Sequence, residues 1–347
     1  MLSRIIKICR RSHCERIITC RAYSSNTPQL NTENEVDPAP IFFNQEVQQA
    51  LKILTRIDYK KVVRKRLTGE KLQVPEYKFM TDKELEEALD LAKKRAEKRL
   101  QMPPVVKTRK EIDIVLSKDE ALEGFSTSKY VFTDITFGIK DRDRFILVRE
   151  LDGTLRYAKW DERDRLNQVY ISTKGKEMIA PKLFQGEYLE NLLRREAYEY
   201  LLDRACLQYD PDDPEYKRVT KAVYEDINQK KQFECLRSTR HFGPFVFYLA
   251  WNNSIDKLLC NIIESEKIEE AVALIRLYHK IHPQAKSALT ECESEDPIKL
   301  IMHYASLDAP LSPLVKKTLA VYQEIEKEKQ KVKEGIKKAH GIDSDES

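Results

Sequence analysis

The sequence predicts an α+β fold that is mostly α, with N-terminal helices, a small antiparallel β-sheet in the middle and a C-terminal α-helical, solenoid-like region. Alternating β-branched and aromatic residues, which indicate strands, are concentrated between residues 129 and 160. On either side, apolar residues recur every three or four positions, which favours amphipathic helices. Only 9 glycines occur in 347 residues, which argues against folds that need glycine-rich cofactor loops.

Residues 1–23 have the character of a mitochondrial presequence. They carry six basic residues against Glu15 alone, and their apolar side is spaced as on one face of a helix. The positions on that face are Leu2, Ile5, Ile6, Cys9, His13, Ile17 and Cys20. The segment 21–25 resembles a matrix processing site, so we expect cleavage after Tyr23 and location in the mitochondrial matrix. A disordered basic tail or a surface-binding helix is the alternative.

Charge is distributed unevenly along the chain. The formal net charge is +4, and residues 1–23 contribute +5 of it, which leaves −1 for the rest. The body is therefore not a uniformly cationic nucleic-acid binder, and any RNA contact must come from local basic patches. Residues 24–40 are polar and contain prolines, which predicts a flexible leader. The longest apolar run, Phe245 to Trp251, is far shorter than the roughly 20 residues of a membrane-spanning helix.

Residues 41–110 are expected to form a helical arm with basic patches. The first helix begins near Asn44 and leads into the basic segment 60–66, and its apolar face consists of Val47, Leu51, Leu54 and Ile57. The second follows Thr81, which forms a capping box with Glu84, and it ends before Pro103. Because core-forming signals are sparse before residue 120, we expect the arm to become ordered only on its partners.

Residues 111–186 are expected to contain the sheet. Residues 129–137 and 144–150 alternate as strands, and Asp152–Gly153 turns the chain into a further strand over 154–160. Asp161 can then cap a short helix that extends to residue 169. We therefore predict one small antiparallel sheet followed by one helix.

Residues 187–325 are expected to form a helical domain. Apolar positions indicate one helix over 189–201, another over 216–227, and a pair near 258–263 and 268–278. Helices paired through short loops favour a solenoid-like stack, although no fixed repeat period is present. The charged tail, residues 326–347, is expected to belong to a lone helix that starts near Glu324 and carries Glu–Lys pairs.

No motif for catalysis or cofactor binding is present. The sequence lacks the phosphate loop G-x-x-x-x-G-K-[ST], the dinucleotide fingerprint G-x-G-x-x-G and the hydrolase elbow G-x-S-x-G. His279 and His282 could share a helix face, but zinc would need two further ligands. We therefore predict no enzymatic activity, no cofactor and no metal site. The four cysteines after residue 23 are widely spaced, as expected for thiols in a reducing matrix.

Two basic segments are candidate contacts for RNA or for a protein partner. The first consists of Lys60, Lys61, Arg64, Lys65 and Arg66. The second consists of Arg237, Ser238, Thr239 and Arg240, whose guanidinium and hydroxyl groups suit phosphate contacts. For both segments a protein partner or a structural role is an equally weighted alternative. A third basic cluster, residues 93–99, is better explained as compensation of a helix dipole.

Several segments, taken in order, resemble one known family. They are Met102–Val105, Lys129–Ile135, Arg144–Glu150, Gly153–Arg156, Trp160 with Glu162–Arg165, Tyr224–Ile227, Leu236–Arg240 with Phe242–Gly243, and Leu277–His279 with His282–Pro283. Together they resemble the animal mitochondrial small-subunit ribosomal protein number twenty-two family over roughly residues 42 to 325.

That resemblance implies a structural constituent of the small subunit of the mitochondrial ribosome, which supports mitochondrial translation. The expected partners are small-subunit ribosomal RNA and neighbouring ribosomal proteins, with no membrane and no small-molecule substrate. The resemblance supplies no catalytic residues, and it does not extend to the charged tail. The alternatives are a matrix helical-repeat RNA-binding adaptor that acts outside the ribosome and an unrecognised matrix enzyme.

Overall fold

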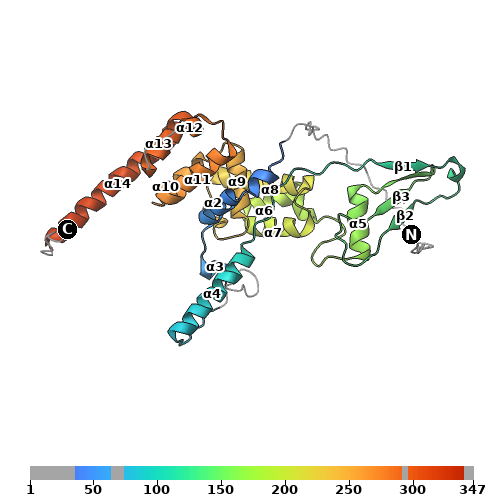
Figure 1. Ribbon diagram of the computed structural model, residues 1–347, viewed down its shortest axis with the longest axis horizontal. Coiled ribbons are helices and arrows are strands. Elements are labelled where there is room, and N and C mark those ends of the chain that lie inside the picture. Colours follow the sequence, from blue (N-terminus) through green and yellow to red (C-terminus); the bar gives the residue numbers. More distant parts are fainter. Residues whose placement is uncertain (1–35, 64–73, 291–295, 340–347) are drawn as a thin grey trace. The chain divides into compact units, whose positions relative to one another are not determined.

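The computed structural model describes residues 36–63, 74–290 and 296–339, which fall into two compact units. The sheet unit consists of residues 109–180, and the helical unit consists of the described residues of 37–108 and 181–339. Helices dominate the described residues (Figure 1), and the four-stranded sheet comes from the middle of the sequence, between residues 115 and 157, which confirms the predicted fold class. The N-terminal helices belong to the same unit as the C-terminal ones.

The sheet unit contains four short antiparallel strands in the order β1-β4-β3-β2. They are β1 (Val115–Lys118), β2 (Tyr130–Thr133), β3 (Ile146–Arg149) and β4 (Thr154–Tyr157), and helix α5 (Trp160–Tyr170) follows them. The last three strands lie within the predicted ranges. Strand β1 is not predicted from the sequence, because its four exposed residues have no alternating pattern. Helix α5 starts one residue before the expected cap, after Lys159.

Helix α5 packs on one face of the sheet. Ile146 and Val148 of β3 are buried there with Ala158, and Leu166 of α5 packs against them. The β3–β4 turn needs a glycine, because Gly153 has φ +78° and a Cβ on it would lie 2.0 Å from the carbonyl oxygen of Asp119. A tight hairpin and a single covering helix therefore define this small unit.

The helical unit begins with α1 (Ala39–Phe42), α2 (Gln45–Thr55), α3 (Tyr59–Val63) and α4 (Asp82–Arg99). Val47, Leu51 and Leu54 of α2 are at most 1% exposed, and α2 packs against α9 and α11. The expectation that the arm is ordered only on its partners is therefore wrong for α2, because its apolar face meets helices about two hundred positions later. Helix α2 ends at Thr55, so the exposed Ile57 does not continue it.

The remaining helices of this unit follow residue 181. They are α6 (Gly186–Arg194), α7 (Tyr198–Gln208), α8 (Pro214–Lys230), α9 (Phe242–Trp251), α10 (Asp256–Glu264), α11 (Ile268–Ile281), α12 (Lys286–Leu289), α13 (Pro297–Leu307) and α14 (Ser312–Ala339), with 3-10 turns at Lys182–Phe184 and Phe233–Cys235. The single helix predicted over 189–201 is two helices, because Glu196 has φ 58° and reverses the chain between them. Helix α14 starts earlier than predicted, since its first turns bury Val315 and Leu319.

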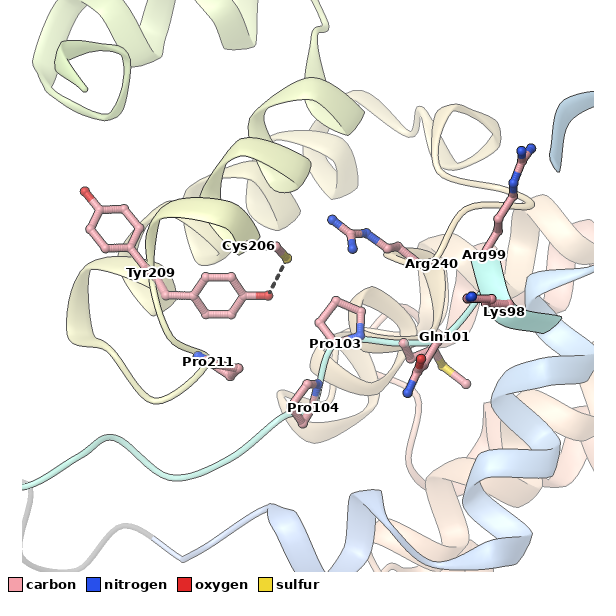
Figure 2. Close-up of a pocket in the computed structure, with 11 residues that line it drawn as sticks. Lys98, Arg99, Gln101, Pro103, Pro104, Cys206, Tyr209, Pro211 and Arg240 are labelled. Carbon is pink, nitrogen blue, oxygen red and sulfur yellow. Dashed lines mark hydrogen bonds between the residues drawn. The ribbon is translucent and has the colours of Figure 1, made fainter. Parts of the chain in front are cut away.

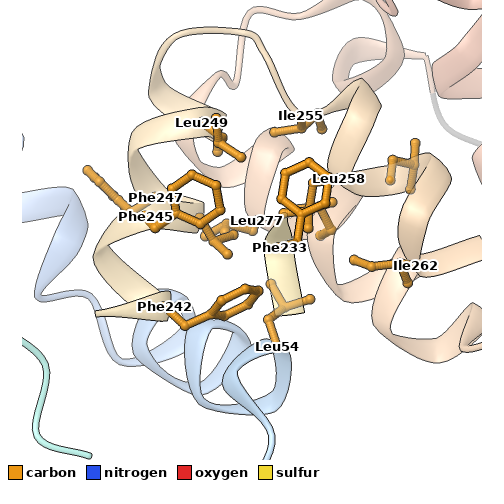
Figure 3. Packing of buried hydrophobic residues seen from close by; sticks show 14 of the residues in the cluster. Leu54, Phe233, Phe242, Phe245, Phe247, Leu249, Ile255, Leu258, Ile262 and Leu277 are labelled. Atoms are coloured by element: carbon orange, nitrogen blue, oxygen red, sulfur yellow. The ribbon is translucent and has the colours of Figure 1, made fainter. Parts of the chain in front are cut away.

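The core of the helical unit is centred on α9 (Figure 3). Eight of its ten residues are buried, which explains the longest apolar run of the sequence. Leu54 of α2 lies beside Phe233 and Phe242 in this cluster, so the stack of helices is not strictly sequential. Within the described residues, no helix is both long and apolar enough to cross a membrane.

Candidate RNA and partner contacts

The two lysines of the first basic segment that lie on α3 have different surroundings. Lys60 is exposed. The Nζ of Lys61 instead donates hydrogen bonds to the carbonyl oxygens of Cys235 and Arg237, at 3.1 and 2.6 Å. The first carbonyl ends the 3-10 turn Phe233–Cys235 and the second lies two residues after it, so both need donors from elsewhere. Lys61 therefore has a structural role, because it joins α3 to this segment. The other three members of the segment, Arg64, Lys65 and Arg66, lie outside the described residues.

Arg237 is buried at the junction of three elements, with 4% of its surface exposed. Its Nη1 donates to the carbonyl oxygen of Leu54 at 2.5 Å and lies 3.6 Å from the carboxylate of Glu270, which also binds Arg56. The guanidinium carbon lies 4.3 Å from the ring centre of Phe242. Burial and the neighbouring Arg56 lower the pKa of Arg237. These internal partners favour the structural alternative over phosphate contact.

Ser238 and Thr239 also direct their hydroxyl groups inward. Ser238 has φ 57°, its backbone N–H donates to the carbonyl oxygen of Thr55, and its Oγ accepts from the N–H of Asp58 at 3.1 Å. The Thr239 hydroxyl donates to the carbonyl oxygen of Leu236 at 2.6 Å. Both residues are at most 7% exposed. Ser238 joins the end of α2 to the segment before α9, and Thr239 fixes a turn within that segment.

Arg240 is the member of the second segment that reaches the surface, with 35% of its side chain exposed. Its Nε donates to Oδ1 of Asp203 at 2.9 Å, and Nε2 of the buried His241 lies 2.8 Å from the same oxygen. Burial raises the pKa of Asp203, but the hydrogen bonds and charges of His241 and Arg240 outweigh it, so the net pKa is lowered. A carboxylate that stays ionised thus orients the Arg240 guanidinium.

A cavity of about 330 Å³ lies beside Arg240 within the helical unit (Figure 2). Its lining includes three cations, which are Lys98 and Arg99 at the end of α4 and Arg240 before α9, and none of the described residues that line it is acidic. The remaining lining residues are Gln101, Met102, Pro103, Pro104, Cys206, Tyr209, Pro211 and Tyr216. We call this cavity the basic pocket.

The cations of the basic pocket differ in availability. Arg99 donates to the carbonyl oxygen of Val62, and Figure 2 shows its side chain directed away from the cavity. Arg240 points into the space beside Cys206, and Lys98 is exposed at the end of α4. From the sequence, Lys98 is expected only to compensate the dipole of α4. Nothing near it in the sequence indicates that α4 ends beside residues 206–216 and 240. Two cations at a cavity are suited to a phosphate group.

The basic pocket does not have the arrangement of a nucleophilic active site. The Sγ of Cys206 lies 3.5 Å from the hydroxyl oxygen of Tyr216, and burial raises the pKa of the Cys206 thiol, which keeps it protonated. His241 is occupied by Asp203. The basic pocket therefore lacks an activated thiolate among the described residues that line it.

The histidines that could have shared a metal have other partners. The Nε2 of His279 lies 2.8 Å from the Ser287 hydroxyl, and the Nε2 of His282 lies 2.9 Å from the carbonyl oxygen of Ala250. Burial lowers the pKa of His279, which favours its neutral form. In the part of the chain that the structure describes, no cluster of three or more His, Cys, Asp or Glu side chains is suited to a metal ion.

Comparison with known proteins identifies the family. The sequence model described as mitochondrial 28S ribosomal protein S22 matches residues 40–283. The chain belongs to this family. Its matched part includes strands β1–β4 and helices α2–α11, whereas α13 and α14 follow it. The family is one of ribosomal proteins, not of enzymes, which agrees with the predicted lack of catalysis.

Two mammalian relatives are similar over most of the chain. The small ribosomal subunit protein mS22 of Mus musculus is 40% identical over 287 residues, which cover 82% of this chain and 79% of the relative. The protein of the same name from Bos taurus is 37% identical over 306 residues, covering 88% of this chain and 83% of the relative. These matches confirm the resemblance stated from the sequence motifs.

Proposed function

We propose that this chain is a structural component of the small subunit of the mitochondrial ribosome and works in the matrix. Membership of the mitochondrial S22 family carries the proposal, and both relatives are named as small ribosomal subunit proteins. The match includes the sheet unit and most of the helical unit, which favours a ribosomal protein over the matrix RNA-binding adaptor. Neighbouring ribosomal proteins are its expected partners.

Sedimentation tests this proposal directly. A tagged full-length chain, expressed in cells of the species that it comes from, should sediment with mitochondrial small subunits in a high-salt gradient. A structural constituent is held there by many simultaneous contacts. Depletion of the protein should reduce the amount of assembled small subunit. A stable pool that remains free of ribosomal particles at low and high salt would instead support the adaptor.

We also propose that residues 1–23 direct import and are removed after Tyr23. Six basic residues and a single acid on a helical pattern suit transport driven by the membrane potential. The protein isolated from mitochondria should therefore begin at Ser24, as determined by mass spectrometry of its N-terminal peptide. Recovery of peptides from residues 4–16 in the mature protein would contradict this proposal.

For ribosomal RNA, we propose a contact surface made of Lys60, Arg64, Lys65 and Arg66 together with Lys98 and Arg240 at the basic pocket. Lys60 and Lys98 are exposed, and Asp203 orients Arg240. Phosphate contacts of this type position a protein on RNA without reading its sequence. Lys61, Arg237, Ser238 and Thr239 have internal partners, so we assign them to the support of this surface.

Alanine variants separate the two halves of the surface. One variant changes Lys60, Arg64, Lys65 and Arg66, and the other changes Lys98 and Arg240, while Lys61 and Arg237 are kept to preserve the fold. Each variant should dissociate from small subunits at a lower salt concentration, because it makes fewer phosphate contacts. Each lost contact should also reduce the slope of log binding constant against log salt concentration by about one. The control is Lys221→Ala with Lys317→Ala on α8 and α14, and equal salt resistance of all variants would rule out this surface.

A further inference from the structure

Helix α4 has an apolar stripe that the rest of the described chain covers only at one end. Ala96, near the end of the helix, is fully buried, whereas Leu85 and Leu89 are 50% and 49% exposed. Ala88 and Ala92 lie on the same face of the helix, between Leu85 and Ala96. The stripe therefore runs without interruption from its exposed start to its buried end. It extends over about 16 Å, the rise of eleven helical residues.

The segment that leads into α4 is also rich in exposed apolar side chains. Val74, Tyr77 and Phe79 are 76%, 94% and 109% exposed, and Met80 is 47% exposed. Single exposed apolar residues are ordinary, but a run of them that continues into a helical stripe is typical of an interaction surface. Helix α4 is capped by Thr81 and Glu84, yet Ala96 is its one buried residue, so tertiary packing in this chain contributes little to its stability.

Charge on α4 is strongly divided along its length. Its first half contains five acids, Asp82, Glu84, Glu86, Glu87 and Asp90, against one lysine. Its second half contains Lys93, Lys94, Arg95, Lys98 and Arg99 against one glutamate. The acidic half surrounds the exposed leucines and would repel RNA phosphates, whereas the basic end lies at the basic pocket.

We propose that the stripe of α4 binds an amphipathic helix of another small-subunit protein, which lies antiparallel to α4. The partner would continue the burial of the stripe that begins at Ala96. Because helix dipoles favour acids at the start and bases at the end of any helix, an antiparallel partner places opposite charges beside each half of α4. This inference rests on the proposed function, because it takes the partner from the same particle.

A photo-crosslinking amino acid in place of Leu89 tests the occupant of the stripe. In assembled small subunits, position 89 should give one protein adduct that survives ribonuclease and is lost on protease treatment. The same probe in place of Glu87, on the opposite face of α4, should give at least about tenfold less of that adduct. An RNA adduct, an adduct to a second copy of this chain, or no adduct from sedimented particles would overturn the inference.

Matched double variants test the energetic role of the stripe. For this test the crosslinking probe is placed at position 80. Changing Leu85→Glu together with Leu89→Glu should reduce the yield of the partner adduct by at least about tenfold, because two apolar contacts are lost. Lys83→Gln with Lys94→Gln makes the same change in net charge on the opposite face and should alter it less than about twofold. Equal losses would overturn the inference. Sedimentation of the same samples reports the proposed function separately, because a chain absent from small subunits fails that proposal first.

Discussion

The segment 237–239 has residue types that suit phosphate binding, but its surroundings in the fold give it a structural role. Guanidinium and hydroxyl groups in one short segment suit phosphate recognition, but here they bind the carbonyl of Leu54, the N–H of Asp58 and the carbonyl of Leu236. Arg237 satisfies a helix end that has no further intrahelical partner. Its burial could not be inferred from its neighbours in sequence, because Leu54 and Glu270 are 183 and 33 positions away.

Replacing Arg237 by alanine should destabilise the helical unit by about 3 kcal/mol, because a buried, hydrogen-bonded charge that joins three elements is removed. The two tryptophans of the chain, Trp160 and Trp251, lie in different units, so Trp160→Phe leaves Trp251 as a reporter of the helical unit in urea unfolding. Lys60→Ala should change the unfolding free energy by less than about 0.5 kcal/mol. Similar midpoints for both variants would contradict the structural role of Arg237.

At the scale of elements, local signals predict the type of an element better than its ends. The capping box of α4 is present, with Thr81 and Glu84 each bonded to the backbone N–H of the other. The sequence does not indicate the chain reversals after α2 and α6. Arg56 and Glu196 adopt φ 56° and 58° at these points, where a glycine would have signalled a reversal. Such strained positions are maintained by packing rather than by residue preference.

The same capping chemistry should have different consequences in α4 and α8. Thr81→Ala removes an N-cap bond worth about 1 kcal/mol, but it should only speed amide exchange in the first turns of α4, where no core residue lies. Asp213→Ala removes the N-cap of α8, which buries six residues, and should lower the melting temperature of the whole helical unit. A clear loss of global stability in Thr81→Ala would show that α4 is part of the core.

At the scale of the whole molecule, the chain forms two units whose polar networks differ. In the sheet unit, Arg156 binds Glu150, which directly follows β3, and Glu162 on α5, at 2.5 and 2.8 Å. The helical unit uses the buried Asp256 instead, which accepts from the hydroxyl of Tyr304 and the N–H of Leu311. Burial raises the pKa of Asp256, whereas the hydrogen bond with Arg156 lowers the pKa of Glu162 to about 2.

This difference predicts an acid sensitivity of the sheet unit. A carboxyl whose folded pKa is below its unfolded value stabilises the fold above the unfolded value, and that contribution is lost as pH falls from about 4.5 to about 2. Glu162→Gln should therefore be less stable at neutral pH and show a shallower loss of stability over that range. With Trp251→Phe, fluorescence of Trp160 reports the transition, and identical pH dependence of the two proteins would contradict the role of Glu162.

The sequence by itself determined the mostly helical α+β class, strands β2 to β4, the capped helix α4 and the family, because these depend on patterns within a few residues or on ordered motifs. Tertiary structure alone decided that α2 enters the core, that Lys61 and Arg237 turn inward, and that Lys98 meets Arg240 at one pocket. The physical reason is distance along the chain. A helix or strand forms from near neighbours, whereas burial and the availability of a charge depend on residues that only the folded chain brings together.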